Sequence, residues 1–156
     1  MLVLPGMASI GKRIININEM IQFNGWISVE LNSVFEGRSV MVDLKRFEET
    51  MKPLIVGFDM DNQFIELKRM NGLFVYFIGG AHNHRLSYLE SVISIYEKVA
   101  ELAPSSFGLL YVRLPDDEVF WNKYRVFRLA KGLITEHEDT LLSPCDPVIE
   151  DNSIDD

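Results

Sequence analysis

The chain has 156 residues, of which 47% are hydrophobic and 24% are charged, and this suits one compact domain with a continuous core. Fifteen Lys and Arg against 23 Asp and Glu give a net charge of −8, which repels phosphate backbones and anionic membranes. The charge therefore argues against nucleic-acid and membrane partners and favours a basic protein partner, although acidity that serves only solubility explains it equally well.

The first regular pattern starts at Gln22, after a segment without a period that we interpret as an N-terminal extension over residues 1–20. Ile27, Val29 and Leu31 then recur at every second position, which predicts a strand with one buried face. Apolar residues spaced by three and four predict a helix that ends at Pro53; its stripe comprises Val40, Leu44, Phe47, Met51 and Leu54.

A β-hairpin is predicted around Asn71-Gly72, because both residues accept the positive φ of a type I′ turn. Its second strand, residues 73–78, is apolar on both faces and is expected to lie inside the sheet, ending at Gly79-Gly80, while the first strand, residues 63–70, is more exposed. Ser87-x-x-Glu90 then predicts a capping box at the start of a second helix, which ends before Pro104.

Three further strands are predicted over residues 107–114, 124–130 and 133–136. The predicted order is βαββαβββ, an α+β domain with a mostly antiparallel sheet and two helices. Pro144 and Pro147 exclude a helix or central strand near the C-terminus, so we expect an extended tail laid over the body, with residues 152–156 frayed.

His82 and His84 are the first candidates for a metal or catalytic site, because two histidines two apart on an extended segment can face one ion. A further ligand is required, and His137 does not stand at a diagnostic spacing. The alternative is that Asn83 and His84 bind backbone groups at the junction of strand and helix. We predict no metal site and no cofactor.

Cys145 is the single cysteine, which excludes an internal disulfide and fits a reducing cytoplasm. No basic residue or helix start beside it would stabilise a thiolate, so a packed tail cysteine is favoured over a nucleophile. No apolar run approaches the length of about 20 residues that spans a bilayer, and no secretory segment is recognised. We expect a soluble cytoplasmic protein that is not an enzyme.

Trp26 shares a face of the first strand with Ser28 and Glu30, opposite the apolar face, and a large aromatic residue there needs a cover. The cover is either the C-terminal tail or a partner. The same parity groups side chains of two later strands on one face each, namely Phe107, Leu109, Tyr111 and Arg113 in one and Tyr124, Val126 and Arg128 in the other.

Several separated motifs stand out: Gly25-Trp26, Asn83-His84-Arg85, Ala103-Pro104, Gly108-Leu109-Leu110-Tyr111, Arg128-Leu129-Ala130, Gly132 and Leu142-Ser143-Pro144-Cys145. Together they resemble the immunity protein 7 family of bacterial polymorphic toxin systems. The resemblance implies an α+β domain over residues 21–151, a binder that protects the cell from a cognate toxin, and no catalytic residue.

An acidic inhibitor can occupy the basic cleft of a toxin such as a nuclease and gain long-range steering there. The candidate toxin-binding surface comprises Asp116, Asp117, Glu118, Phe120 and Trp121, with Glu136, Glu138 and Asp139 nearby. The alternative is a solvated hairpin loop with Trp121 folded inward. Two other functions stay open: a small α+β enzyme that uses the His82/His84 region, and a regulatory or scaffold domain that forms a homodimer.

Overall fold

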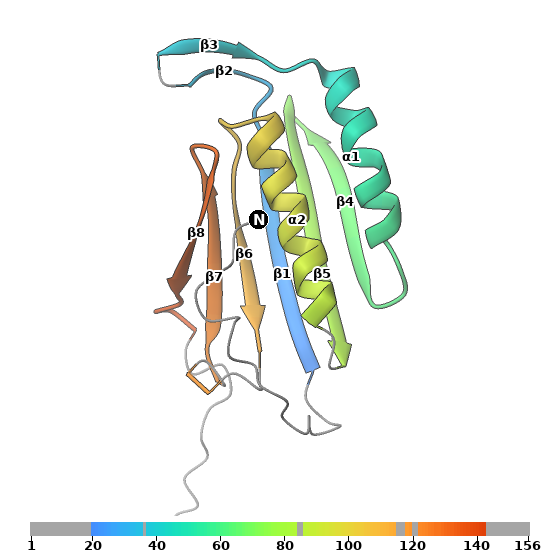
Figure 1. The fold of residues 1–156 in the computed structure, drawn as a ribbon, viewed down its shortest axis with the longest axis vertical. Helices are drawn as coiled ribbons and strands as arrows, with labels where there is room; N and C mark the ends of the chain where they lie inside the picture. Colours follow the sequence, from blue (N-terminus) through green and yellow to red (C-terminus); the bar gives the residue numbers. More distant parts are fainter. Residues whose placement is uncertain (1–19, 36, 84–85, 115–117, 120–121, 143–156) are drawn as a thin grey trace, which may run out of the picture.

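The computed structural model describes residues 20–35, 37–83, 86–114, 118–119 and 122–142. They form a six-stranded antiparallel sheet, a separate two-stranded hairpin and two helices (Figure 1). The strand order of the large sheet is β4-β5-β1-β6-β7-β8, so β4 and β8 are its edges. The elements are β1 (Met20–Val29), β2 (Asn32–Phe35), β3 (Arg38–Met41), α1 (Leu44–Phe58), β4 (Gln63–Met70), β5 (Leu73–Asn83), α2 (Leu86–Leu102), β6 (Phe107–Arg113), β7 (Tyr124–Ala130) and β8 (Leu133–Glu138).

The predicted α+β class is confirmed, and the large sheet with its two helices follows the predicted order βαββαβββ. The small β2–β3 hairpin was not predicted. It occupies the segment where the helical stripe was expected to begin, so Val40 belongs to β3 and not to α1. The prediction began the helix too early because Val40 and Leu44 are four residues apart, which is a helical spacing. Gly37, at φ 76°, instead turns this segment into a hairpin.

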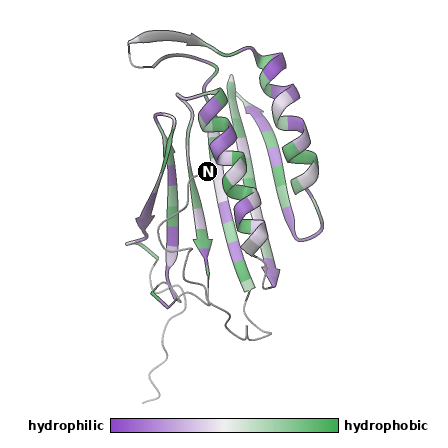
Figure 2. Cartoon of the chain, viewed as in Figure 1, coloured by the Kyte–Doolittle hydropathy of each residue, from purple (hydrophilic) through white to green (hydrophobic). Residues whose placement is uncertain are grey.

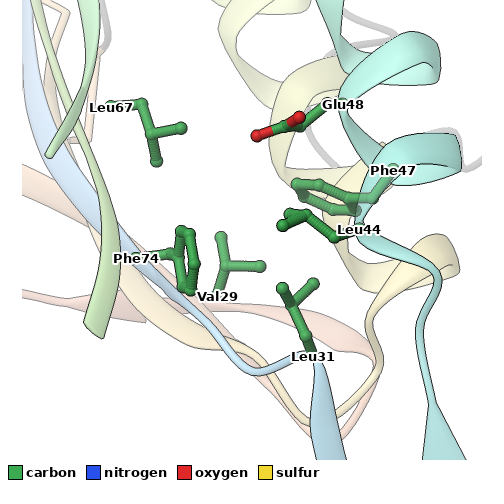
Figure 3. Close-up of a pocket in the computed structure, with 7 residues that line it drawn as sticks. All are labelled: Val29, Leu31, Leu44, Phe47, Glu48, Leu67 and Phe74. Carbon is green, nitrogen blue, oxygen red and sulfur yellow. The ribbon is translucent and has the colours of Figure 1, made fainter. Parts of the chain in front are cut away.

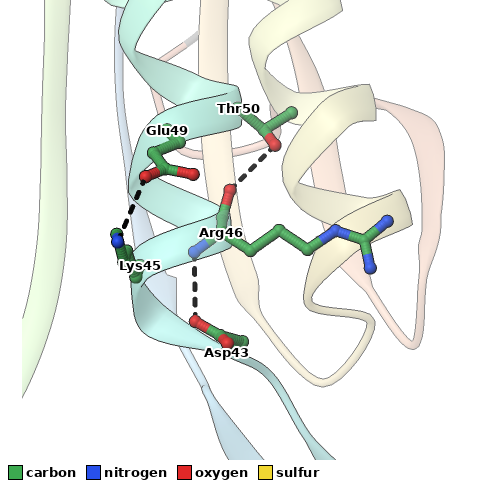
Figure 4. A network of polar contacts seen from close by, with 5 residues as sticks. All are labelled: Asp43, Lys45, Arg46, Glu49 and Thr50. Atoms are coloured by element: carbon green, nitrogen blue, oxygen red, sulfur yellow. Dashed lines mark hydrogen bonds and ion pairs between the residues drawn. The ribbon is translucent and has the colours of Figure 1, made fainter.

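The N-terminus of α1 is held by local polar contacts (Figure 4). The Asp43 side chain accepts a hydrogen bond from the backbone nitrogen of Arg46 at 3.1 Å and so caps the helix. In the following turns the Thr50 hydroxyl donates to the Arg46 carbonyl oxygen at 2.8 Å, and Lys45 lies 3.9 Å from Glu49. The helix thus begins at Leu44 because a capping residue precedes it.

The prediction that α1 ends at Pro53 is wrong, since the helix continues to Phe58. A proline inside a helix removes one backbone hydrogen bond and costs about 3 kcal/mol. Met51 and Phe58, on either side of Pro53 in the sequence, are buried against the sheet, whereas Pro53 is exposed. Burial of each large apolar side chain contributes about 1.5–3 kcal/mol, so the packing offsets the cost of the proline.

The hairpin of β4 and β5 turns at Asn71 and Gly72, whose φ angles of 48° and 83° confirm the predicted turn. As expected, β5 lies inside the sheet; β4, which was expected to be more exposed, is an edge strand. A second turn with two positive φ angles joins β7 to β8, at Lys131 (53°) and Gly132 (69°).

The predicted break of β5 at Gly79-Gly80 is wrong, because the strand continues to Asn83. Both glycines lie against aromatic rings. A Cβ at Gly79 would lie 2.6 Å from the Phe64 ring, and one at Gly80 would meet the ring of Phe23. These glycines therefore serve packing across the strand and do not end it.

The second predicted helix is confirmed as α2, and it ends before Pro104 as expected. Ser87 is the second residue of this helix, so it is not the capping residue that the pattern suggested; its carbonyl oxygen instead accepts a hydrogen bond from the Ser91 hydroxyl at 2.9 Å. A stripe of apolar residues along α2, continuing to Ala103 just past its end, is buried: Leu89, Val92, Ile93, Tyr96, Val99, Ala100 and Ala103.

Both helices cover the same face of the large sheet (Figure 1). Along β1 the odd-numbered residues Ile21, Phe23, Ile27 and Val29 point to this side and are buried in the core. Hydrophobic and hydrophilic residues alternate along the helices, as expected for elements with one covered side (Figure 2). We call the opposite side, which carries the even-numbered residues of β1 and their cross-strand partners, the open face.

No helix within the described ranges is long and apolar enough to cross a membrane. The predicted N-terminal extension, apart from Met20, and the predicted tail from residue 143 onward lie outside the described residues.

Candidate functional site

His82 lies in the core, on the helix side of β5, and is 5% exposed. Its Nε2 is 2.7 Å from Oε1 of Gln63, and its ring stacks on Tyr88 with 3.6 Å between centroids. The Gln63 amide nitrogen donates to the carbonyl oxygen of Phe58, so the Gln63 oxygen is the acceptor and His82 Nε2 carries the proton. This histidine therefore ties β5 to the end of α1 and to α2.

Among the described residues, no group of three or more His, Cys, Asp or Glu side chains could hold a metal ion. His82 is enclosed by the contacts above, and His137 is exposed on β8 within 2.8 Å of the Thr135 hydroxyl. His84, the second histidine of the proposed enzyme site, lies outside the described residues.

A cavity of about 10 Å³, enough for about one water, lies between α1 and the sheet (Figure 3). The Glu48 carboxylate is its polar group, and Glu48 also pairs with Arg69 at 3.0 Å. Burial, and secondarily the charge of Glu48, raise the pKa of the Tyr76 phenol to about 12. The lining residues are Val29, Leu31, Leu44, Phe47, Glu48, Leu67 and Phe74.

A more open groove of about 210 Å³ separates α1 from α2. Its side-chain hydroxyls, those of Ser91 and Ser94, donate to the carbonyl oxygens of Ser87 and Ser91 within α2. No acid, base or activated nucleophile occurs among its lining residues, which are Pro53, Leu54, Gly57, Phe58, Ser91, Ser94 and Ile95.

The motif Gly25-Trp26 has a structural basis in the core. The Tyr96 hydroxyl of α2 donates to the carbonyl oxygen of Leu109 at 2.8 Å, directly beside Gly25. A Cβ at Gly25 would collide with both the Tyr96 hydroxyl and that carbonyl oxygen. Burial strongly raises the pKa of Tyr96, which keeps its phenol protonated as a donor.

The open face brings together three of the motif residues from neighbouring strands. Trp26 of β1 is paired with Leu109 of β6, which is paired with Arg128 of β7, so the three residues form one row across the sheet. Tyr111 lies one row away on the same face and meets Tyr124 edge-on, with 6.1 Å between centroids.

The open face is also rich in exposed apolar side chains. Trp26 is half-buried and meets Phe107 edge-on at 5.9 Å, but Phe107 itself is 46% exposed. Monomeric proteins rarely expose a contiguous apolar surface without a binding role. The large apolar residues exposed on this face are Met20, Phe64, Met70, Leu73, Phe77, Phe107 and Leu133.

The carboxylates of the predicted toxin-binding surface have different roles. Glu136 lies 2.7 Å from Arg125, and Glu138 lies 2.6 Å from Lys123, both on the helix side of the edge strand β8. Asp139 is only 7% exposed. Its carboxylate accepts hydrogen bonds from the backbone nitrogens of Leu141, at 3.3 Å, and Leu142, at 2.7 Å.

The pairing of β6, β7 and β8 places the connection after β6 and the end of β8 at the same end of the sheet, since Arg113 pairs with Tyr124 and Arg125 with Glu138. Glu118 and Val119 are exposed in that connection. Outside the described residues lie the other predicted site and motif residues, namely Asp116, Asp117, Phe120, Trp121, His84, Arg85, Pro144 and Cys145, while Asn83 is exposed as the last residue of β5.

Sequence reasoning did not identify the open face as a single surface. The parity of each strand was visible, but a face spanning several strands depends on which strands are neighbours and in what register. The order β1-β6-β7 joins segments about 80 residues apart in the chain, and no local pattern encodes that pairing.

Comparison with known proteins gives one family. The profile described as Immunity protein 7 matches residues 20–151, from the first residue of β1 to beyond β8. No curated protein and no solved structure gives a significant match. Because the match covers most of the chain, the chain belongs to the immunity protein 7 family.

Proposed function

We propose that this immunity protein binds one cognate bacterial polymorphic toxin and neutralises it by covering its active site or an adjoining surface. The observation that carries the proposal is the family match over residues 20–151. The toxin that best complements a chain of net charge −8 has a basic substrate cleft, as a nuclease does.

The toxin-binding surface in this proposal is the connection between β6 and β7, with Glu136 and Glu138 beside it. Exposed Glu118 and Val119 support it, because they place a carboxylate and an apolar side chain at the protein surface. Asp116 and Asp117 add charge next to Glu118 in the sequence, and Phe120 and Trp121 supply the aromatic anchors that dominate many interfaces.

In this proposal, Asp139 has a structural role and is not a toxin contact. Its carboxylate is engaged by two backbone nitrogens, so it shapes the end of β8 and does not contact the toxin. Glu136 and Glu138 are partly neutralised by Arg125 and Lys123, so they add less charge to the proposed surface than the acidic residues of the connection between β6 and β7.

The test is co-expression with the toxin of the adjacent gene, followed by binding kinetics. Replacing Asp116, Asp117 and Glu118 by Lys lowers the association rate by about tenfold or more at low salt and weakens its salt dependence. Trp121→Ala mainly accelerates dissociation. A matched control makes the same charge change on the exposed faces of α1 and α2, with Lys at Glu49, Glu90 and Glu97.

The proposal of this surface is wrong if the control slows association as much as the loop variant, because net charge alone would then explain the effect. It is also wrong if the folded loop variants protect cells like the parent. Failure of every variant and of the parent to bind the adjacent toxin would contradict the function itself.

A further inference from the structure

The open face differs in charge from the chain as a whole. Among the described strands, the acidic residue on the open face is Glu66, which forms an ion pair with Lys68 on the same strand. Arg128 adds an exposed positive charge on β7, and Arg113 lies on the same face of β6. A surface that is apolar, aromatic and positively charged therefore exists on a protein with a net charge of −8.

The C-terminal segment has the complementary chemistry. Residues 143–156 contain five acidic residues and no Lys or Arg. They also contain apolar residues, among them Val148, Ile149 and Ile154. The N-terminal segment, residues 1–19, is apolar as well, but its charged residues are Lys12, Arg13 and Glu19, which do not complement the arginines of the open face.

The described chain ends close to the positive part of this face. The Asp139 backbone nitrogen donates to the Tyr124 carbonyl oxygen at 3.2 Å, and the Asp139 carboxylate holds the backbone of Leu142. Tyr124 is the open-face residue paired with Arg113. The described chain therefore ends beside β7, at the end of the sheet where Arg113 lies.

The segment is long enough to cross the sheet. Fourteen extended residues reach about 46 Å, at about 3.3 Å per residue. Five strand spacings, the width from β8 to β4, amount to about 24 Å.

We propose that residues 143–156 dock in cis on the open face, across β7, β6 and β1. Their acidic residues face Arg113 and Arg128, and their apolar residues cover Trp26, Leu109 and Tyr111. The inference is independent of the proposed toxin-binding function, because its test requires no toxin.

The first experiment uses Cys145, the only cysteine of the chain, in the full-length protein. His137→Cys places a second thiol on the open face of β8, and Glu138→Cys places it on the opposite face one residue later. A disulfide requires Cα atoms about 4.4–6.8 Å apart, so docking discriminates between the two positions. We expect the intramolecular disulfide to form about tenfold faster in the His137→Cys variant, because docking raises the effective thiol concentration there.

The second experiment reports on Trp26 in a Trp121→Phe background, where it is the only tryptophan. Truncation after Leu142 is expected to shift the Trp26 emission to the red and to increase its quenching by acrylamide. Arg128→Glu in the full chain produces the same change in part, whereas the control Arg46→Glu, at the start of α1, does not. Deletion of residues 1–19 leaves the emission unchanged.

Three results overturn the proposal. Equal disulfide rates at residues 137 and 138, together with unchanged Trp26 emission after truncation, show that the tail does not occupy this face. A red shift on deletion of residues 1–19, but not on truncation after Leu142, makes the N-terminal segment the occupant. Disulfides that form only between molecules, with emission that depends on protein concentration, indicate a second copy of the chain.

Discussion

The hydroxyl of Tyr96 and the carbonyl oxygen of Leu109 are joined by a hydrogen bond of 2.8 Å that passes beside the backbone of residue 25. The bond fixes α2 to the sheet at β6, and it exists because Gly25 has no side chain. The Gly25-Trp26 motif, the packing of α2 on the sheet and the hydrogen bond of a buried hydroxyl all depend on this contact.

Gly25→Ala is therefore expected to destabilise the protein by about 3 kcal/mol, since overpacking a core costs about 1–3 kcal/mol and a displaced hydrogen bond adds about 1 kcal/mol. Urea denaturation measures the change. Gly57→Ala in α1 is the matched control, because an added Cβ there meets nothing within 4 Å. Equal stability of the two variants would contradict the close approach at Gly25.

Alkaline pH is expected to unfold the protein progressively above about pH 10. The folded-state pKa of Tyr76 is raised to about 12 from an ordinary value of 10.0, so the protonated phenol stabilises the fold below pH 10 and this stabilisation is lost as pH rises toward 12. The loss amounts to about 1.4 kcal/mol per pH unit for one such group. Denaturant titrations between pH 9 and 11.5 should show a shallower decline in Tyr76→Phe, and an identical decline would refute the assignment.

Gln63→Ala is expected to cost about 2 kcal/mol or more, because it leaves both His82 Nε2 and the Phe58 carbonyl oxygen without this buried partner. Thermal unfolding provides the measurement. Asn62→Ala is the control, since Asn62 is exposed and precedes Gln63 directly. If both variants melt at the same temperature, Gln63 does not link α1 to β5 energetically.

Asp139→Ala is expected to lower the stability of the fold, whereas Glu138→Ala is expected to leave it nearly unchanged. Loss of the Asp139 carboxylate removes two hydrogen bonds to backbone nitrogens and lowers stability by about 1 kcal/mol, as loss of a helix cap does, with little change in toxin affinity. Glu138 and Lys123 form a half-exposed ion pair whose loss has little effect on stability. A decrease in toxin affinity in Asp139→Ala at unchanged stability would reverse these roles.

The sequence predicted most of the strands and both helices, because strand alternation and turn residues such as Asn71-Gly72 are local signals. It failed where tertiary packing overrode a local rule. Pro53 and Gly79-Gly80 are usual terminators of helix and strand, yet Met51 and Phe58 keep α1 intact and the rings of Phe64 and Phe23 lie against the glycines.

The candidate site was less accessible to prediction. Acidic residues close together in the sequence looked equivalent, but hydrogen bonds to Leu141 and Leu142 separate Asp139 from its neighbour Glu138. Such a distinction depends on how the chain turns after β8, which composition does not encode. The arginine and aromatic residues of the open face could be assigned to single strands but not to a common surface.

The charged residues on the two edge strands of the large sheet affect how a partner can bind. The edge strand β4 carries Glu66 and Lys68, and the edge strand β8 carries Glu136 and Glu138. Charged side chains along an edge oppose the addition of a further strand from another molecule. These charges disfavour growth of the large sheet by edge pairing, and they favour recognition through side chains of a face or a loop over backbone pairing.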